Sequence, residues 1–193
     1  MVPLLSAKKG HLCGLQFRMP QHPHIRPATE QDLPAILEIY NEVLLNTTAA
    51  YVFELHTLEM RQRWFHELRS AGWPVIVSEE NGVVTGFGNI ATFRNKPGYR
   101  YTGEHTLHVH ADHRGKGIGR ALLQALITEA HRCELRTLVG AIDSENAISL
   151  QLHAECGFVE TGRMPQVAWK FGRWLDLVLM QLLLPGPKTP FAT

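Results

Sequence analysis

Hydrophobic and polar positions alternate between helical and strand spacing from about residue 24 to residue 184. The first helix is predicted from apolar side chains three and four residues apart: Leu33, Ile36, Leu37, Tyr40 and Leu44. Thr29 or Asp32 caps this helix, and Pro34 favours Asp32, because proline is tolerated only in the first helical turn. A second helix is predicted from Thr57 to Ala71 and ends at Gly72.

A β-hairpin is predicted next, because Asn81-Gly82 favours a tight turn between the strands Trp73–Glu79 and Val83–Phe93. The remaining predicted elements are an edge strand at Ile25-Arg26, a strand from Glu104 to His110, a helix from Ile118 to Arg132, a strand from Thr137 to Ile142, a helix from Asn146 to Glu155, and two late strands near Phe158 and from Trp174 to Leu184. The order predicts an α+β fold with a mixed, mainly antiparallel sheet flanked by helices.

Size and composition predict one globular domain over residues 24–184, with a flexible extension over 1–23 and a tail over 185–193. The net charge of +1 gives no reason to expect nucleic acid or an acidic membrane as partner. No apolar run approaches the roughly 20 residues that span a bilayer. Cys13, Cys133 and Cys156 are too few and too scattered for a disulfide framework or a zinc site. We therefore expect a reduced, cytoplasmic enzyme.

The segment Arg114-Gly-Lys-Gly-Ile-Gly-Arg120 carries the clearest chemical signal, because it joins a predicted strand to a predicted helix. Glycine lets the backbone turn sharply and approach a ligand, and the free N–H groups at a helix start favour an anion. The spacing fits neither a Walker A loop nor a dinucleotide-binding fingerprint. The segment therefore predicts a pyrophosphate site of another kind, and a tight turn without a ligand is the alternative.

A second motif follows about thirty residues later, Asn146-Ala-Ile-Ser-Leu-Gln-Leu-His153 and then Cys156-Gly157-Phe158. Together the two motifs resemble the GNAT acetyltransferase superfamily, whose first motif binds the coenzyme A pyrophosphate and whose second lies along the pantetheine arm. The matching positions are Arg114, Gly117 and Gly119 in the first motif and Asn146, His153, Gly157 and Phe158 in the second.

Several other segments resemble the phosphinothricin and methionine sulfoximine N-acetyltransferase branch of that superfamily. They are Asn46-Thr-Thr-Ala49, Gly72-Trp-Pro-Val-Ile-Val77, Phe93-Arg94, Gly98-Tyr-Arg-Tyr-Thr-Gly-Glu104, Met164-Pro-Gln-Val and Lys170-Phe-Gly-Arg-Trp-Leu-Asp176. The resemblance implies acetylation of the α-amino group of a glutamate-like amino acid, such as phosphinothricin, methionine sulfoximine or methionine sulfone. Acetyl-CoA is the implied co-substrate, no metal is expected, and a homodimer is implied.

The resemblance also implies the site residues. Acetyl-CoA is expected to contact Leu107, His108, Val109, Arg114, Gly115, Lys116, Gly117, Ile118, Gly119, Arg120 and Asn146. The amino-acid substrate is expected to contact Arg94, Asn95, Lys96, Glu104, His105 and Thr106. Arg94 is the expected carboxylate ligand, since guanidinium offers a bidentate fork. Lys170 and Trp174 are expected near the substrate end, and a backbone N–H near Val109 is expected to meet the oxyanion.

Acetyl transfer requires an ammonium group to lose its proton and a leaving thiolate to gain one. Glu104 is the candidate base, and a role confined to binding the substrate ammonium is its alternative. His153 takes the position where many GNAT enzymes carry a tyrosine that protonates the thiolate, and an imidazole with a pKa of about 6.5 can do the same.

One alternative is disfavoured and two remain open. The dense histidines His105, His108, His110 and His113 suggest a metal site, but strand alternation puts His105 on the opposite face from His108 and His110. A peptide or other amine is an alternative substrate, and it would need an open groove rather than a closed cationic pocket. A coenzyme A-binding sensor without turnover is the third, although it would not need Glu104, Arg94 and His153 together.

Overall fold

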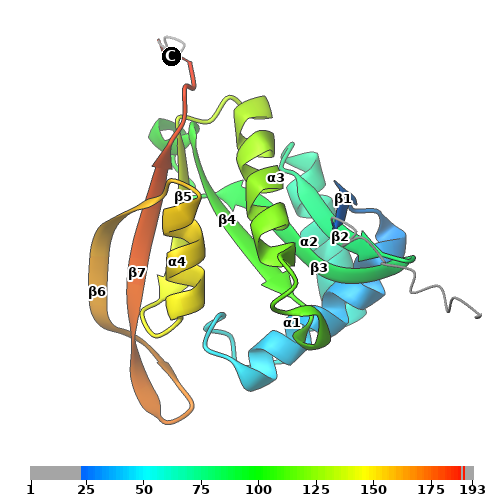
Figure 1. Ribbon diagram of the computed structural model, residues 1–193. Helices are drawn as coiled ribbons and strands as arrows, with labels where there is room; N and C mark the ends of the chain where they lie inside the picture. Colours follow the sequence, from blue (N-terminus) through cyan, green and yellow to red (C-terminus); the bar gives the residue numbers. More distant parts are fainter. Residues whose placement is uncertain (1–22, 188, 190–193) are drawn as a thin grey trace, which may run out of the picture.

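A seven-stranded mixed sheet forms the centre of the computed structural model, which describes residues 23–187 and residue 189 (Figure 1). The strands are β1 (His24–Pro27), β2 (Val75–Glu80), β3 (Val83–Thr92), β4 (Thr102–Val109), β5 (Thr137–Asp143), β6 (Val159–Lys170) and β7 (Arg173–Leu183). Their spatial order is β1-β2-β3-β4-β5-β7-β6, and β4 and β5 make the parallel pair. The predicted α+β fold with a mainly antiparallel sheet is confirmed.

Helices cover both faces of this sheet (Figure 1). They are α1 (Leu33–Asn46), α2 (Leu58–Ser70), α3 (Ile118–Arg132) and α4 (Ala147–Glu155), with short 3₁₀ helices η1 (Glu30–Asp32), η2 (Pro97–Tyr99) and η3 (Ala111–His113). One hydrophobic cluster packs α3, with support from α4, against the sheet, and a second packs α1 and α2 against β2 and β3. No helix within the described residues is long and apolar enough to cross a membrane.

Local signals account for most element boundaries. The side chain of Thr57 accepts a hydrogen bond from the N–H of Met60 at 3.3 Å and so begins α2. Asn81 and Gly82 have φ angles of 53° and 79°, which the tight hairpin between β2 and β3 requires. The predicted helix Ile118–Arg132 matches α3 residue for residue.

The start of α1 differs in two respects from the prediction. Asp32 occupies the cap position, but its carboxylate accepts hydrogen bonds from the N–H of Thr29 at 2.7 Å and from Arg26 at 2.8 Å instead of capping α1. The buried face is also rotated, since Ile39 is buried while Leu37 is only half-buried. The ion pair with Arg26 therefore fixes this turn to β1.

The parallel strands β4 and β5 separate partway along their length. They pair from Thr102 with Thr137 to His105 with Gly140. Beyond that point β4 stays paired with β3 as far as Val109, and β5 stays paired with β7 as far as Asp143. The predicted strand end at His110 is one residue too far. The facing backbone groups of residues 106–109 and 141–143 therefore have no strand partner on that side.

The extension predicted for residues 1–23 and the tail predicted for residues 185–193 fall mostly outside the described residues. Of the former only Pro23, and of the latter residues 185–187 and 189, belong to the described part.

Candidate active site

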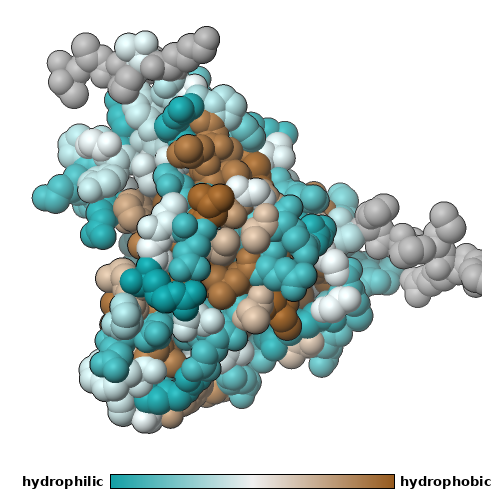
Figure 2. All heavy atoms as spheres, turned by 60° about the vertical axis from the view of Figure 1, so that its left-hand side comes forward, coloured by the Kyte–Doolittle hydropathy of each residue, from teal (hydrophilic) through white to brown (hydrophobic). Residues whose placement is uncertain are grey.

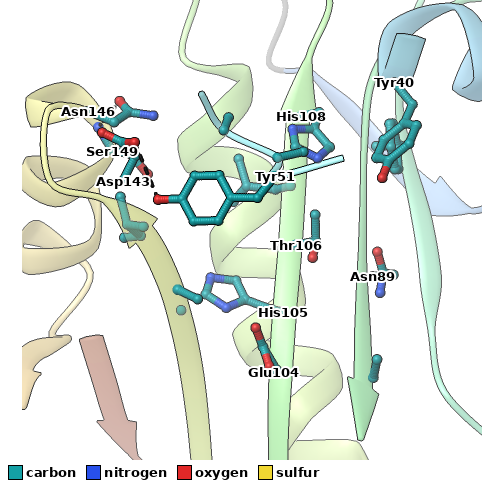
Figure 3. A pocket seen from close by; sticks show the side chains of 18 of the residues that line it. Tyr40, Tyr51, Asn89, Glu104, His105, Thr106, His108, Asp143, Asn146 and Ser149 are labelled. Carbon is teal, nitrogen blue, oxygen red and sulfur yellow. Dashed lines mark hydrogen bonds between the residues drawn. The ribbon is translucent and has the colours of Figure 1, made fainter. Parts of the chain in front are cut away.

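A cavity of about 570 Å³ lies where β4 and β5 separate (Figure 3). Its walls are residues 104–108 of β4, residues 140–143 of β5, residues 48–51 of the loop between α1 and α2, and parts of α1, α2, β3 and α4. The cavity reaches both sides of β4, because successive side chains of a strand point to opposite faces. The two halves of the cavity are therefore lined by different side chains of β4.

The half facing α1 and α2 contains alternate residues of β4, Glu104, Thr106 and His108. His108 is buried and packs edge-on against Tyr40 and tilted against Phe87, with ring centroids 5.9 Å and 5.4 Å away. Burial lowers the pKa of His108 to about 4, so the ring is neutral, and its Nε2 has no partner among the described residues. The predicted alternation is confirmed, since His105 packs on the other side of β4.

Glu104 is the carboxylate of this half of the cavity. Burial raises the pKa of Glu104 above its usual value, and the charge of Arg94 partly offsets that shift. Since a carboxyl group whose pKa moves toward neutrality is a better proton acceptor at working pH, the direction suits a general base. The structure brings Glu104 into the cavity as predicted.

Arg61 of α2 supplies a cation to the same half of the cavity. It is 4% exposed, and its guanidinium lies 4.0 Å from the ring centroid of Tyr40 and 4.6 Å from that of Trp64. Nε of Arg61 also donates to Nδ1 of His56 at 3.2 Å. Among the described residues, Arg61 forms no ion pair with any carboxylate. The aromatic rings therefore support a buried charge that has no anionic partner of its own.

Sequence reasoning missed Arg61, although a signal was present. Arg61, Phe65 and Leu68 are the buried residues of α2, and their spacing is that of an apolar helical face. A charged residue on such a face indicates either a buried ion pair or a ligand.

The loop between α1 and α2 covers the opening between β4 and β5. The hydroxyl group of its Tyr51 donates to Oδ2 of Asp143 at 3.3 Å (Figure 3). Burial, and then the charge of Asp143, raise the pKa of Tyr51 to about 12, so the hydroxyl stays protonated. Lys170, which is buried, donates from Nζ to the carbonyl groups of Thr47 and Ala50 at 2.8 Å and 2.7 Å. No local pattern around Tyr51 predicts this contact.

The other half of the cavity contains Asn146, His105 and His153. Asn146 precedes α4, and its side-chain oxygen accepts a hydrogen bond from the N–H of Ser149 at 3.1 Å. His153 is buried in the last turn of α4, and its Nε2 lies 2.9 Å from Nε2 of His105. His105 therefore contacts α4 and β5 rather than α1 and α2.

The glycine-rich turn lies beyond the end of β4 and leads into α3. Gly115 and Gly117 have φ angles of 76° and 81°, a conformation that favours glycine, and open space surrounds the position of a Cβ on each. Arg114 pairs with Glu42 of α1 at 2.6 Å, and Arg120 pairs with Glu155 of α4. Lys116 makes no ion pair within the described part of the chain. The turn thus presents the start of α3 and one lysine to solvent.

Several predicted substrate residues lie outside the cavity wall. Arg94, Asn95 and Lys96 are exposed on the segment between β3 and η2 and do not line the cavity. Lys170 holds the α1–α2 loop, and Trp174 is 58% exposed, so neither lines the cavity. Among the described residues no group of three or more histidine, cysteine or acidic side chains could hold a metal ion.

Comparisons with known proteins agree with this architecture. The chain is 49% identical over 168 residues to the L-amino acid N-acyltransferase MnaT of Escherichia coli, which covers 87% of this chain and 98% of MnaT. It is 48% identical over 168 residues to an L-methionine sulfoximine/L-methionine sulfone acetyltransferase of Salmonella typhimurium, with the same two shares covered. The solved structure of yncA from Salmonella typhimurium with its cofactor acetyl-CoA superposes with a TM-score of 0.87 at 46% identity, over 90% of this chain and 100% of that one.

Residues 33–158 also match the model of the acetyltransferase (GNAT) family. This span runs from the start of α1 to the residue before β6 and includes the cavity wall formed by α2, β4, β5 and α4. The chain therefore belongs to the GNAT acetyltransferase family.

Proposed function

We propose that the protein transfers the acetyl group of acetyl-CoA to the α-amino group of a small, glutamate-like L-amino acid. Methionine sulfoximine, methionine sulfone and phosphinothricin are the proposed substrates, and the amine attacks the thioester directly in a ternary complex. One observation supports this most: a buried guanidinium, Arg61, and a half-buried carboxylate, Glu104, line the same half of one cavity.

A free amino acid is a zwitterion, and this half of the cavity is complementary to it. Arg61 offers its free N–H groups to the α-carboxylate, while Glu104 faces the α-ammonium group. An unpaired buried charge is costly, and an incoming carboxylate would relieve that cost at Arg61. Arg94, at the rim, adds a second positive charge beside Glu104. A peptide or a lysine side chain lacks the adjacent carboxylate, so the cavity favours a free amino acid.

The opening between β4 and β5 supports acetyl-CoA as co-substrate. The unpaired backbone edges of residues 106–109 and 141–143 offer hydrogen-bonding groups to an amide-containing arm. Beyond the opening, the glycine turn of residues 115–119 and the start of α3 offer N–H groups to phosphate, with Lys116 adding charge. Acetyl-CoA supplies the activated acetyl group. The chain supplies orientation and acid–base groups, and no metal ion is part of the proposal.

Glu104 and His153 divide the proton transfers between them. Glu104 takes a proton from the substrate ammonium, directly or through a water molecule, and its raised pKa suits that role. His153 lies on the other side of β4 at the position that the family motif assigns to the acid, and it protonates the leaving thiolate. A sensor that only binds coenzyme A would need neither group.

We also propose a homodimer. Large apolar side chains remain exposed on β6, on β7 and between them: Val159, Met164, Val167, Trp169, Phe171, Trp174 and Leu183. Figure 2 brings this side of the molecule forward and shows hydrophobic side chains along the middle of the face, bordered by hydrophilic ones. Large exposed apolar side chains gathered on one hairpin are typical of a protein interface. Light scattering of the purified chain tests the dimer, and a monomeric mass contradicts it.

A panel of acceptors tests the function. Acetyl-CoA-dependent thiol release is measured with methionine sulfoximine, methionine sulfone, phosphinothricin, glutamate, methionine and a lysine peptide. We expect fast turnover confined to the sulfoximine, the sulfone or phosphinothricin. Turnover on the peptide alone contradicts the proposal, and acetyl-CoA binding without turnover on any acceptor favours the sensor.

A further inference from the structure

The side chains of His105 and His153 form a continuous chain of polar contacts between two backbone carbonyl groups. Nδ1 of His105 lies 2.8 Å from the carbonyl oxygen of Val139. The two Nε2 atoms lie 2.9 Å apart, and Nδ1 of His153 lies 2.7 Å from the carbonyl oxygen of Ser149. Each distance is that of a hydrogen bond, so each contact needs one hydrogen atom between its two heavy atoms.

Counting these hydrogen atoms fixes the charge of the pair. A carbonyl oxygen only accepts, so both Nδ1 atoms must carry a hydrogen atom. Two neutral imidazoles have no further hydrogen atom, and their Nε2 lone pairs would then face each other at 2.9 Å. The N–H···N contact requires a third hydrogen atom. With it, the pair would carry one positive charge.

We infer that His105 and His153 share one proton and that this pair, rather than His153 alone, supplies the proton to the leaving thiolate. The inference rests on the proposed acetyl transfer. His153, which lines the cavity, is the acid in this inference, whereas His105 acts through it and is a positioning residue. The resemblance assigned His105 to substrate contact, but its side chain is committed to Val139 and His153.

Burial opposes charge on the pair, and it opposes a second charge more strongly than the first. Burial lowers the pKa of His105 to about 4, with the charge of His153 adding to the shift, and burial also lowers the pKa of His153. A shared proton acts in the opposite direction, because one ring donates it while the other accepts it. The N–H···N contact therefore favours one proton on the pair, and burial excludes two.

Neighbouring side chains hold the rings in place without neutralising them. Phe158 stacks on His105 at 5.4 Å between ring centroids and meets His153 edge-on at 5.1 Å. Neither ring forms an ion pair with any carboxylate among the described residues. The titratable groups that line the same cavity are Glu104 and His108 from β4, Asp143 from β5, Tyr51 from the α1–α2 loop, Arg61 from α2 and Tyr40 from α1. The shared proton thus has no counter-ion beside it.

The proton balance of the step is complete. The substrate ammonium gives one proton to Glu104, and its nitrogen forms a bond to the thioester carbon. As the carbon–sulfur bond breaks, the electron pair goes to sulfur. The Nε2–H of His153 leaves its contact with His105 and gives its proton to the thiolate, so that both rings become neutral. The nitrogen loses its second proton as the amide forms, and the pair regains one proton from that source or from solvent.

Nuclear magnetic resonance of the full-length protein labelled with ¹⁵N in histidine tests the proton count without any substrate. The chain contains 11 histidines, so spectra of His105→Phe and His153→Gln assign the two rings. At about pH 7.5 we expect both Nδ1 atoms to be protonated and one further proton to be shared between the Nε2 atoms. Two protons in total on the two rings overturn the inference, whatever the activity.

The pH dependence of kcat tests the role in acetyl transfer. In His105→Phe the shared proton is lost, and burial keeps the pKa of the remaining His153 low. We expect the ratio of variant to wild-type kcat to rise roughly tenfold from about pH 8.5 to about pH 6.5, with the KM for acetyl-CoA within about twofold of wild type. In His105→Gln an amide oxygen can accept the proton of His153, so this variant should recover much of the alkaline activity.

The outcomes separate this inference from the proposed function. A ratio that does not change with pH in His105→Phe, or a glutamine variant no better than phenylalanine, reduces His105 to a packing residue and contradicts the inference. His131→Asn, on the exposed end of α3, is the matched control and should leave kcat and its pH profile unchanged. If three protons are found but no amino acid on the panel is acetylated, the shared proton is supported and the proposed substrate class is contradicted.

Discussion

Tyr51 and Asp143 are 92 residues apart in the sequence, yet the tyrosine hydroxyl lies 3.3 Å from the aspartate Oδ2 across the opening between β4 and β5. Lys170 holds the preceding residues of the α1–α2 loop through the carbonyl groups of Thr47 and Ala50. The contact between Tyr51 and Asp143 therefore holds the other end of this loop over the cavity. In the proposed function, the amino acid enters the cavity beneath this cover. The contact therefore belongs to substrate retention rather than to the chemical step.

Tyr51→Phe should weaken binding of the amino acid and spare the chemistry. Loss of a partly exposed hydrogen bond costs about 0.5–1.5 kcal/mol, which corresponds to a rise in KM of roughly 2- to 12-fold, and kcat should stay within about twofold. Steady-state kinetics at saturating acetyl-CoA measure both. Tyr99→Phe, on an exposed residue of η2, is the control. A fall in kcat of more than about 100-fold would instead place the hydroxyl in proton transfer.

Arg61→Met should lower kcat/KM for the amino acid by roughly 10- to 150-fold, because a charge-assisted hydrogen bond contributes about 1.5–3 kcal/mol. The KM for acetyl-CoA should not change. Arg61→Lys should recover only part of the loss, since an ammonium group lacks the planar fork and the stacking on Tyr40 and Trp64.

Thermal unfolding separates binding from packing at this position. Replacing a buried, unpaired guanidinium by an apolar chain of similar length is often neutral or stabilising, so Arg61→Met should unfold at no lower temperature than wild type. Arg63→Met, on the exposed face of the same helix, is the control, since the one ion pair of Arg63 among the described residues is with Glu59. A less stable Arg61→Met variant with unchanged kcat/KM would make Arg61 a structural residue.

Glu104→Gln should lower kcat by roughly 100- to 10,000-fold, the range of general-base catalysis. In the wild type, activity should fall as pH falls through the raised pKa of Glu104, because the base must be ionised. Unchanged turnover of the variant at all pH values removes Glu104 from proton transfer.

The pH dependence of stability should be opposite to that of activity at Glu104. Its pKa is raised by folding, so the stability that it contributes is present below the unfolded pKa and is lost as pH rises through the folded pKa. Glu104→Gln removes that loss. The melting temperature of the variant minus that of the wild type should therefore increase from mildly acidic to neutral pH. Glu67→Gln, on an exposed residue of α2, is the matched control.

Gly140→Ala should disrupt the histidine pair. A Cβ at Gly140 would lie 2.7 Å from Cε1 of His105 and 3.2 Å from Nε2 of His153. Overpacking of this kind costs about 1–3 kcal/mol in the free energy of unfolding. The cost should shrink when the same change is made in a His105→Ala background. Gly162→Ala in β6 is the control, because no atom lies within 4 Å of its added Cβ. Equal costs in both backgrounds would contradict the assigned contact.

The sequence predicted those parts of the fold that local signals determine. The glycine after α2, the Asn81-Gly82 turn and the helix Ile118–Arg132 depend on neighbours in the chain, and the structure contains all three. The predicted cap of α1 is the exception, because the side chain of Asp32 bonds elsewhere. The family motif also directed attention to His153, which lines the cavity.

The remaining features depend on contacts between distant segments. The separation of β4 from β5 arises from different partners on their outer edges, and no pattern within either strand encodes it. The neighbour of His153 is 48 residues away in the sequence, and Arg61 gains its aromatic partner Tyr40 from another helix. Arg94 and Lys96 are recognisable in the sequence as charges beside proline and glycine. The spacing of Arg61 marks it as a charge on an apolar helical face, but its contacts depend on the fold.

The most direct test of the account compares one substrate with its α-carboxamide. The ratio of kcat/KM for methionine sulfone to that for methionine sulfone amide is measured in the wild type and in Arg61→Met. We expect a ratio of roughly 10 to 150 in the wild type, since a charge-assisted hydrogen bond to the carboxylate is lost, and a ratio near one in the variant. Equal rates for the acid and the amide in the wild type would contradict a cavity built for a free amino acid.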